Sequence, residues 1–486
     1  MSNDAFLTLT RTNFQGDDLR RIIDALEFAT IAHEGQVRKS GVPYMTHVLG
    51  TATKLIELGM DVETVVAGLL HDVPEDTSYT LDDVENLFGP TVAKLVAGVT
   101  KLGKLKYRGM ERYVENLRKM FVAMSEDIRV MIIKFADRLH NLSTLEALPA
   151  DKQLRIARES MEIYAPLAHR LGMGEIKGQL EDLSFPYVLP TEYAWVRGLV
   201  GTRYEALDRI VEDMQKSVTT ALTNAQVTIM SMHGRRKHLY SLYEKLIRPE
   251  YNRDLAKIYD LVALRIVVNN VADCYTALGV VHQLWRPLPN RFKDYIAQPK
   301  PNGYQSLHTC VFGPNGQPVE IQVRDYAMHQ LAEYGVAAHW HYTEQGKPIA
   351  PSAVQEKVAW VKQLSDWRQE VGNDEAFLEA LKIDALQKRI FCFTPTGDVI
   401  DLPEHATPID FAYHVHSDLG TTCVGARVND KLVSLETELR SGDVIEILTD
   451  KNRKSPNQDW LTIAKTQTAR GHIRKAIREA REARDF

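Results

Sequence analysis

Cysteine is scarce in this chain, and its few copies form none of the usual patterns. The 486 residues include four cysteines, which lie far apart and contain no CxxC pair: Cys274, Cys310, Cys392 and Cys423. Such spacing argues against a structural zinc site and against a disulfide framework. Any metal must therefore be held by histidines and carboxylates.

Long apolar runs and a strong charge imbalance are also missing. No stretch approaches the ~20 apolar residues that span a bilayer, and the opening MSNDAFLTLTRTNFQGDD lacks the basic-then-apolar layout of a signal peptide. The formal net charge of -5 shows that the chain as a whole is no polycation for nucleic acid, although local basic patches remain open. We therefore expect a cytoplasmic protein with no membrane partner and no DNA partner.

The chain does have length and a change of period along it. With 44% hydrophobic and 25% charged residues, its composition is typical of a soluble protein. Apolar residues recur at helical spacing up to about residue 195, and a long amphipathic helix is expected over 192–225. Strand-like runs such as YDLVALRIVVN then begin. The sequence predicts an all-α domain over 1–195 and a mixed α/β domain over 196–385.

A third unit is expected over 386–450, followed by the start of a helical region over 451–486. IFCFTPTGDVIDLP is typical of a hairpin with Thr-Gly-Asp at its turn. Thr407, Pro408 and Asp410 have the order of a helix start, with cap, first-turn proline and early carboxylate. SGDVIEILTD is then a closing strand, whereas the basic tail RGHIRKAIREAREARDF shows no core of its own.

One short segment, GLLHDVPEDT at 68–77, concentrates an imidazole and three carboxylates. Pro74 disfavours helical geometry at the residue before it and cannot donate a backbone hydrogen bond. We therefore expect the helix to end near Asp72 and a new turn to begin at Pro74. The break separates a rigid pair, His71 and Asp72, from a re-aimed pair, Glu75 and Asp76.

Two further segments supply matching side chains. SGVPYMTHV contains His47, and IKFADRLHNL contains Asp137 and Asn141. Imidazoles and carboxylates together suit a divalent ion that keeps positions open for water and phosphate, with manganese the expected occupant. The expected ligands are His47, His71, Asp72 and Asp137. A lone His-Asp pair in a helix is more often a surface or capping pair, so this prediction depends on the three segments together.

Glu75 and Asp76 lie near these ligands without being counted among them. A carboxylate in that place can orient or deprotonate an attacking water, as general-base catalysis requires. We therefore expect both residues to be catalytic.

These segments resemble the HD phosphohydrolase superfamily. HEGQVRKSGVPYMTHV, GLLHDVPEDT and ADRLHNL are similar specifically to the hydrolase domain of long RelA/SpoT homologues. The resemblance implies removal of the 3′-pyrophosphate from ppGpp and pppGpp. It also implies that the nucleotide is faced by Arg38, Lys39, Ser40 and Asn141. The chain departs from the pattern at Ser143, where relatives commonly carry arginine.

A second group of polar residues lies in GRRKHLYSLYEK, 234–245. Lys237, Ser241 and Lys245 recur at four-residue spacing, as on one helical face, with Arg235 at its entrance. Such a face suits a triphosphate, because cations and backbone amides at a helix start both favour anions. Two other roles for this basic face are open: it could simply be solvated, or it could bind RNA.

Two carboxylates follow this basic stretch. Asp260 opens the strand DLVALRIVV, and Glu320 alternates with apolar residues in VEIQVRD. Carboxylates on neighbouring strands beside a basic helix predict a magnesium-binding site for pyrophosphoryl transfer. Between them, the turn at Asn302 presents Tyr304 for stacking on a base, although alone Tyr304 is more often a packed turn residue.

This second group resembles the synthetase domain of the same family, which has a polymerase-β-like nucleotidyltransferase fold. The resemblance implies transfer of the β,γ-pyrophosphate of ATP to the 3′-hydroxyl of GDP or GTP. It implies that ATP is bound by Arg235, Lys237, Ser241 and Lys245. It also implies that magnesium is bound by Asp260 and Glu320. It makes Glu320 the activator of the acceptor hydroxyl, and it places Asn302, Tyr304 and His308 on the guanine nucleotide. RFKD at 291–294 matches the basic signature of bifunctional members.

FAYHVHSDLG, in the third unit, resembles the TGS domain, a small β-grasp module. The resemblance implies a ribosome or tRNA contact through His416, which matches a position at the tRNA 3′ end in ribosome-bound relatives. The alternative is that His416 only caps or packs its helix.

The resulting hypothesis is a bifunctional alarmone enzyme whose ligands are ATP, GDP or GTP, and (p)ppGpp. The helical stretch 150–225 is the expected coupler between its two sites. A hydrolase with a regulatory nucleotide pocket is the enzyme alternative. A ribosome or tRNA sensor is the non-enzyme alternative, and the full carboxylate set argues against it.

Overall fold

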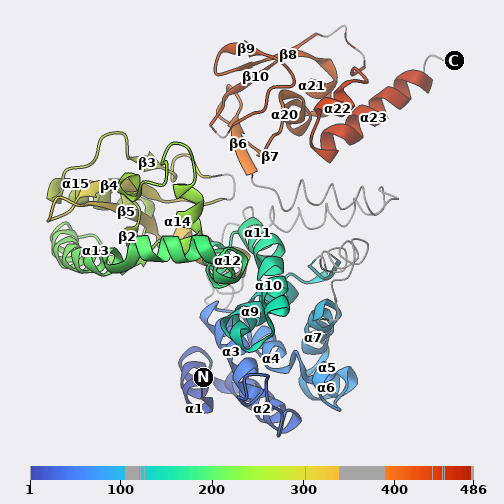
Figure 1. The fold of residues 1–486 in the computed structure, drawn as a ribbon, viewed down its shortest axis with the longest axis vertical. Helices are drawn as coiled ribbons and strands as arrows, with labels where there is room; N and C mark the ends of the chain where they lie inside the picture. Colours follow the sequence, from blue (N-terminus) through green and yellow to red (C-terminus); the bar gives the residue numbers. More distant parts are fainter. Residues whose placement is uncertain are drawn as a thin grey trace. The chain divides into compact units, whose positions relative to one another are not determined.

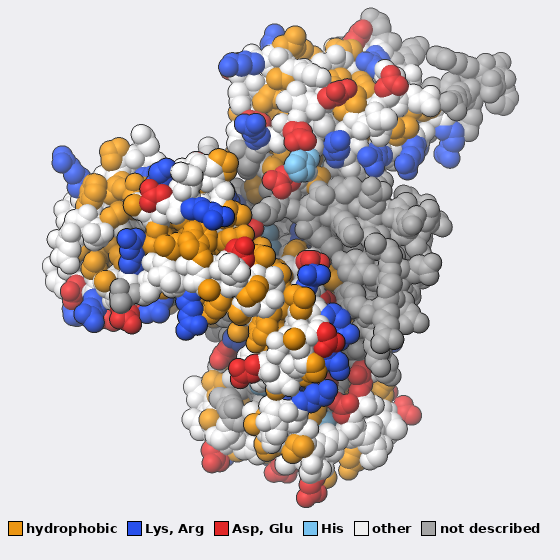
Figure 2. Space-filling view, viewed as in Figure 1, with side chains coloured by type: hydrophobic (Ala, Val, Ile, Leu, Met, Phe, Trp, Pro, Cys, Tyr) orange, Lys and Arg blue, Asp and Glu red, His pale blue; other side chains and the backbone are white. Residues whose placement is uncertain are grey.

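The computed structural model describes residues 2–103, 120, 122–124, 126–300, 303–338, 389–440, 442–450, 453 and 455–482. The chain divides into two compact units, Met1–Gln369 and Glu370–Phe486, and each is described by itself (Figure 1). On the face drawn in Figure 2, basic and acidic side chains are interspersed, in keeping with the small net charge. None of the described helices is long and apolar enough to cross a bilayer.

The first unit begins as a bundle of helices, as expected from the 3.6-residue period. Its core lies where α3 packs on α4 and α9, with Val48, Leu55 and Phe135 fully buried. The bundle comprises α1 (Asn3–Asn13), α2 (Gly16–Ala32), α3 (Met45–Glu57), α4 (Val62–Leu70), α5 (Val73–Asp76), α6 (Leu81–Phe88), α7 (Pro90–Gly103) and α9 (Arg129–Ser143).

Connecting helices continue the first unit without a long loop. They are η1 (Leu145–Ala147), α10 (Ala150–Glu159), the π-helical η2 (Ser160–Tyr164), α11 (Ala165–Arg170), α12 (Gly174–Val188) and α13 (Pro190–Asn224). The long helix expected over 192–225 is confirmed as α13, but its backbone is non-helical at Gly201, so the helix is kinked there.

A five-stranded mixed sheet follows, in the order β1-β2-β5-β4-β3. Only the β2–β5 pair is parallel among its strands. The strands are β1 (Ile229–Arg236), β2 (Val262–Val268), β3 (Lys293–Asp294), β4 (Leu307–Phe312) and β5 (Pro318–Asp325). The helical elements are α14 (Leu239–Leu246), η3 (Leu255–Lys257), α15 (Val271–Leu284), α16 (Tyr326–Tyr334) and η4 (Gly335–Ala337).

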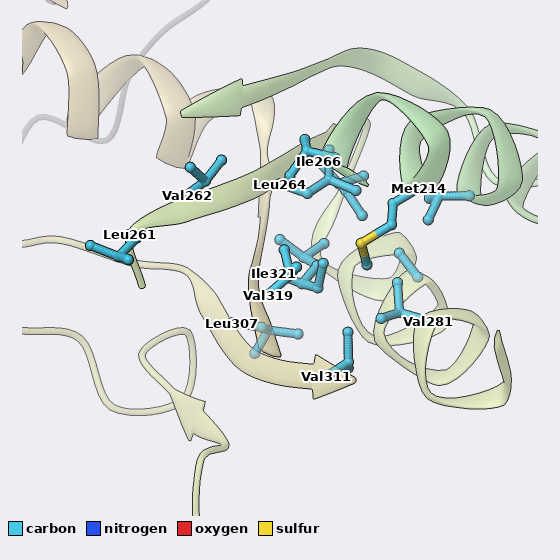
Figure 3. Packing of buried hydrophobic residues seen from close by; sticks show 14 of the residues in the cluster. Met214, Leu261, Val262, Leu264, Ile266, Val281, Leu307, Val311, Val319 and Ile321 are labelled. Atoms are coloured by element: carbon cyan, nitrogen blue, oxygen red, sulfur yellow. The ribbon is translucent and has the colours of Figure 1, made fainter. Parts of the chain in front are cut away.

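The two faces of this sheet differ because side chains alternate along each strand. Met214 of α13, Val281 of α15 and Ile321 of β5 meet in an apolar core on one face (Figure 3). Glu320 of β5 points to the opposite face, where Ala263 of β2 is its register partner. The apolar face anchors the strands, and the polar face is left for a binding site.

The second unit combines two small sheets with helices, and its predicted hairpin and closing strand are confirmed. β6 and β7 pair antiparallel, and the other sheet has the order β10-β8-β9. Its elements are β6 (Arg389–Phe393), β7 (Val399–Pro403), α20 (Pro408–Val415), α21 (Ser417–Thr422), β8 (Cys423–Val428), β9 (Lys431–Val433), β10 (Ile445–Thr449), α22 (Trp460–Ile463) and α23 (Gln467–Glu482).

The helix start at Thr407 is also confirmed, because Thr407 and Asp410 form a capping box at α20. The basic tail forms no core of its own but shares one with the rest of this unit. Ala469 and Ile473 of α23 are buried in a cluster with Tyr413 and Trp460. The few apolar residues of this tail lie on one face of α23. In the sequence they are outnumbered by charged residues, so the apolar face is hard to recognise.

Candidate metal centre and nucleotide pocket

The predicted break within GLLHDVPEDT is present. Helix α4 ends at Leu70, and the short helix α5 runs from Val73 to Asp76 with Pro74 in its first turn. A proline is tolerated there because a first-turn amide has no intrahelical partner in any case. The first helix ends slightly earlier than expected, so His71 and Asp72 lie in the junction between the two helices.

Four side chains from α3, the junction and α9 converge beside this break. His47 Nε2 lies 3.3 Å from Asp72 Oδ2 and 3.3 Å from Asp137 Oδ1. His71 Nε2 lies 3.2 Å from Asp72 Oδ2 and 4.0 Å from Asp137 Oδ1. The ligand atoms of His47, His71 and Asp137 all lie within 4.8 Å of one another. The predicted ligand set is thus brought together, with Asp72 in contact with both histidines.

The chemistry of this cluster fits a divalent metal. His71 Nδ1 lies 2.7 Å from the Gly68 carbonyl and donates to it, so Nε2 is the ring nitrogen that can bind a metal. His71 Nε2 is buried and finds no partner with hydrogen-bond geometry in the described part of the chain. A metal-ligating histidine usually has this arrangement, with its other nitrogen donating to a carbonyl or carboxylate.

Both aspartates of the cluster are ionised at neutral pH. Burial alone would raise their pKa values, but His71 and His47 hold the pKa of Asp72 well below its usual range. Lys134, whose Nζ lies 2.7 Å from Asp137 Oδ2, does the same for the pKa of Asp137. Oδ1 of Asp137 remains turned toward His47.

Tyr44 connects the ligands to the predicted catalytic carboxylates, a contact that none of the sequence motifs predicted. Its hydroxyl lies 2.7 Å from Asp72 Oδ2 and 2.7 Å from Asp76 Oδ2. Burial and the Asp72 charge raise the pKa of Tyr44, so the hydroxyl keeps its hydrogen and donates it. Glu75 and Asp76 are exposed beside the cluster. The signal that could have found Tyr44 is its position one helical turn before His47.

The four residues expected to face a nucleotide separate into two pairs. Arg38 Nη2 donates to Asn141 Oδ1 over 2.6 Å, which joins the loop before α3 to α9. Lys39 and Ser40 lie in an exposed turn closed by the bridge between Val37 and Pro43.

A second site lies on the polar face of the sheet, in a cavity of about 530 Å³. Lys237 Nζ and Lys245 Nζ each lie 2.9 Å from an oxygen of Asp260. Burial would raise the pKa of Asp260, but these two lysines lower it to about 2. Ser241 and Arg235 line the same cavity.

The prediction that Lys237 begins a helical face is wrong. Gly234, Arg235 and Arg236 belong to β1, Lys237 follows this strand, and α14 begins at Leu239. A strand that runs into a helix still directs Lys237 and Lys245 to the same carboxylate, because Asp260 precedes the neighbouring strand β2. The lysines therefore converge by tertiary structure and not by helical period.

Glu320 lies on β5, next to β2 as expected, within a chain of hydrogen bonds. His308 Nδ1 lies 3.1 Å from Glu320 Oε1, and Tyr304 Oη lies 2.8 Å from His308 Nε2. Burial raises the pKa of Glu320, but His308 more than offsets it, so the net pKa is lowered. Asp260 lies just before β2, which starts at Val262 and not at Asp260 as expected, and Glu320 lies on the adjacent strand β5. Two ionised carboxylates placed in this way are a donor set suited to a hard cation such as magnesium. Asn302 lies outside the described residues.

The ring of Tyr304, expected to stack on a base, is surrounded by cations. Lys300 Nζ lies 4.9 Å and Arg324 Cζ 5.3 Å from the ring centroid. The base-stacking role stays a prediction.

Family models match three parts of the chain. They are the HD domain over residues 25–174, the region found in RelA and SpoT proteins over 234–347, and the TGS domain over 390–449. A GTP pyrophosphokinase of Streptomyces antibioticus is 48% identical over 97% of this chain and 58% of its own length. The bifunctional (p)ppGpp synthase/hydrolase SpoT of Escherichia coli is 45% identical over 97% of this chain and 66% of its own length.

The chain belongs to the long RelA/SpoT type. It spans roughly three fifths of the length of these curated relatives. A small alarmone synthetase from Bacillus subtilis, a solved structure, is 26% identical over 36% of this chain and 99% of its own, with a TM-score of 0.25. That score is too low to compare the two folds. The HD domain implies a divalent metal, and the His47 cluster is its candidate site.

The RelA/SpoT region of this chain has a buried cationic wall that no motif in the sequence predicted. Arg265 Nη1 and Arg324 Nη1 lie 2.6 and 3.3 Å from the same Glu333 oxygen, and both arginines are almost fully buried. Burial lowers the pKa of Arg265 to about 10, with Arg324 adding to the effect. A lone arginine within the apolar run LVALRIVV was the available signal.

His238 joins the cationic segment of the pocket to α12, and this contact was also missed. His238 Nδ1 lies 2.9 Å from Asp182 Oδ2, and Nε2 lies 3.4 Å from Glu175 Oε2. Arg235 Nη2 lies 3.9 Å from the same Glu175 oxygen. Helix α12 therefore forms part of the wall of this cavity.

In the TGS region, His416 is an exposed residue at the start of α21. Its Nδ1 accepts from the Asp418 amide over 3.2 Å, so His416 does cap this helix. Contact with tRNA stays a prediction.

Proposed function

We propose that the chain is a bifunctional alarmone enzyme. In its HD domain it hydrolyses the 3′-pyrophosphate of (p)ppGpp to give GDP or GTP. In its RelA/SpoT region it transfers pyrophosphate from ATP to the 3′-hydroxyl of GDP or GTP. The observation that carries the proposal is that one compact unit assembles both charged sites, each with ionised carboxylates.

For hydrolysis, His47, His71, Asp72 and Asp137 would hold the metal, which we propose is manganese. When bound, it supplies Lewis-acid stabilisation of charge on the phosphate oxygens. Asp76, held by the Tyr44 hydroxyl, and its neighbour Glu75 orient the attacking water, and one of the two carboxylates takes its proton. Arg38 and Asn141, already joined by a hydrogen bond, hold the nucleotide.

For synthesis, Arg235, Lys237, Ser241 and Lys245 hold the ATP phosphates in the cavity. Asp260 and Glu320 would hold magnesium, which neutralises charge on the phosphates. Glu320 takes the proton from the 3′-hydroxyl, and the hydrogen bond from His308 keeps its carboxylate in place. Tyr304, His308 and Asn302 bind the guanine nucleotide. The RFKD segment, which resembles the signature of bifunctional members, brings Arg291 and Lys293 into the lining of the cavity.

The test is a pair of assays on the same purified protein. ATP, GDP and magnesium should yield ppGpp, and ppGpp with manganese should release pyrophosphate. Asp72→Ala should abolish only hydrolysis, and Glu320→Gln should abolish only synthesis. No ppGpp formation by the wild-type protein would leave a hydrolase alone, and no turnover in either direction would leave a nucleotide sensor.

We also propose a cytoplasmic enzyme that contacts ribosome-bound tRNA through the TGS region. The support is the exposure of His416, whose ring stays accessible while its Nδ1 caps α21. Ribosome binding that is unchanged by His416→Ala would contradict this contact.

A further inference from the structure

His140 is a half-buried residue next to the metal cluster. It is neither one of the expected metal ligands nor one of the residues expected to face the nucleotide. It lies on α9 between Asp137 and Asn141, with its ring turned toward α3. The ring centroids of His140 and His47 are 5.0 Å apart, and the two Nδ1 atoms are 3.0 Å apart. This separation is that of a hydrogen bond, in which one ring donates and the other accepts.

Arg38 decides which ring is the donor. Its Nη1 lies 3.3 Å from the same His140 Nδ1. A guanidinium can only donate, so His140 Nδ1 is an acceptor and carries no hydrogen. The hydrogen in the contact between the two rings therefore belongs to His47 Nδ1.

The consequence is a defined tautomer for His47. A neutral imidazole with its hydrogen on Nδ1 has its lone pair on Nε2. Nε2 is the atom that lies 3.3 Å from both Asp72 and Asp137. His140 thus prepares His47 for the metal in the way that the Gly68 carbonyl prepares His71.

Gly50 provides a second, independent observation. It lies three residues after His47, on the same face of α3. A Cβ at residue 50 would lie 2.0 Å from His140 Cδ2 and 2.6 Å from its Nε2, closer than any real contact. The absence of a side chain at residue 50 is what lets the His140 ring lie against α3 beside the ligand.

We propose that His140 is a positioning residue of the metal centre, which fixes the tautomer and ring plane of His47, and that Gly50 makes room for it. The proposal rests on the metal centre of the proposed function. It assigns His140 no contact with substrate. Loss of an outer hydrogen-bond partner typically lowers metal affinity about 10- to 100-fold.

The test is the affinity of the metal-free protein for Mn²⁺, measured by titration of free ion. His140→Leu, which fills similar space without an acceptor, should weaken binding by about 10- to 100-fold. His140→Asn places an amide oxygen near the position of Nδ1 and should rescue most of the loss. Equal losses in the two variants, or none in His140→Leu, would overturn the proposal.

A double-mutant cycle adds the role of Gly50. Gly50→Ala should weaken Mn²⁺ binding in the wild-type background and change nothing further beside His140→Ala, because the clash is then gone. Additive losses of Mn²⁺ affinity in the double variant would contradict the role of Gly50 in making room for His140. Nitrogen NMR of labelled histidine in the metal-free protein should show His47 with its hydrogen on Nδ1, and the other tautomer would refute the assignment.

Failure of this inference is distinguishable from failure of the proposed function. If wild-type protein binds Mn²⁺ with the expected variant pattern but releases no pyrophosphate from ppGpp, only the proposed function fails. If it hydrolyses ppGpp and His140→Leu binds Mn²⁺ normally, only the positioning role fails.

Discussion

Pro74 shows how one residue sets the direction of the chain beside the metal cluster. His71 and Asp72 both have right-handed helical φ/ψ values, so the backbone on either side could join into one helix. The missing amide of Pro74 and its clash with the preceding turn oppose that continuation. The proline was readable from the sequence because its effect is local and covalent.

We predict that Pro74→Ala joins α4 and α5 into a continuous helix. Glu75 and Asp76 would then turn away from their present positions, and hydrolysis should fall by roughly 10- to 100-fold, as for other small misplacements of catalytic groups. Mn²⁺ affinity should hold, because His71 and Asp72 precede the change. Unaltered hydrolysis together with an unaltered break in a crystal structure would show that the proline has no such role.

Tyr44 is a second residue whose contribution can be isolated. Tyr44→Phe removes the hydroxyl between Asp72 and Asp76 but keeps the ring stacked on His33, with centroids 4.7 Å apart. We expect kcat for hydrolysis to drop about 10-fold, with unchanged thermal stability. This is less than the roughly 10²- to 10⁴-fold that general-base catalysis contributes as a whole, because the Asp76 carboxylate stays and only its orienting partner is lost. Tyr79→Phe, whose ring packs on Phe28, is the matched control. A loss of stability that accounts for the loss of activity would contradict the positioning role.

Helix α12 shows how an element can serve a site that lies mainly on others. Glu175, Gly178 and Asp182 recur at helical spacing, so they share one face. His238 lies in that face, because a Cβ at residue 178 would be 2.2 Å from its Cδ2. The glycine thus lets the segment between β1 and α14 approach α12.

We predict that Gly178→Ala raises KM for ATP and lowers the melting temperature of the first unit. Helix propensity alone would stabilise the protein by about 1 kcal/mol, so a loss identifies the clash with His238. Gly198→Ala in α13 is the control, since nothing lies within 4 Å of its would-be Cβ. Stabilisation by both substitutions would show that His238 moves aside freely.

The same contact should depend on pH. Burial lowers the pKa of His238, but Asp182 and Glu175 more than offset it and raise the pKa to about 9. Because this folded-state value exceeds the ordinary 6.5, the charge stabilises the fold fully below about pH 6.5 and progressively less as pH rises through 9. Arg235 and Tyr240 also face this contact.

The measurement is the free energy of unfolding of wild type and His238→Gln across this range. The difference between them should be largest near pH 6 and shrink toward pH 9.5. A constant difference would show that the ring acts by packing and not by charge.

At the scale of the whole molecule, the chain forms two compact units, and Asp410 is central to the second. It caps α20 and accepts backbone amides from Lys465 and Thr466, just before α23. Asp410→Ala leaves several buried donors without an acceptor, at a cost of about 1–3 kcal/mol each.

We predict that Asp410→Ala lowers the melting transition of the second unit, while both catalytic assays on the full chain stay within twofold of wild type. Calorimetry would separate the transitions. Asp418→Ala, at the exposed start of α21, is the control. Loss of both activities at temperatures where the first unit is folded would contradict this independence.

The sequence by itself determined the period of each region, the helix break at Pro74, the cap at Thr407 and the set of residues that carry charge at both sites. These features depend on neighbours along the chain, and local chemistry suffices to read them. Only the tertiary structure decided which atoms meet. Lys237 and Lys245 reach Asp260 from a strand end and a helix, Arg265 and Arg324 share Glu333, and His140 fills the space beside Gly50 to orient His47. Such contacts join distant segments, so no spacing in the sequence could reveal them.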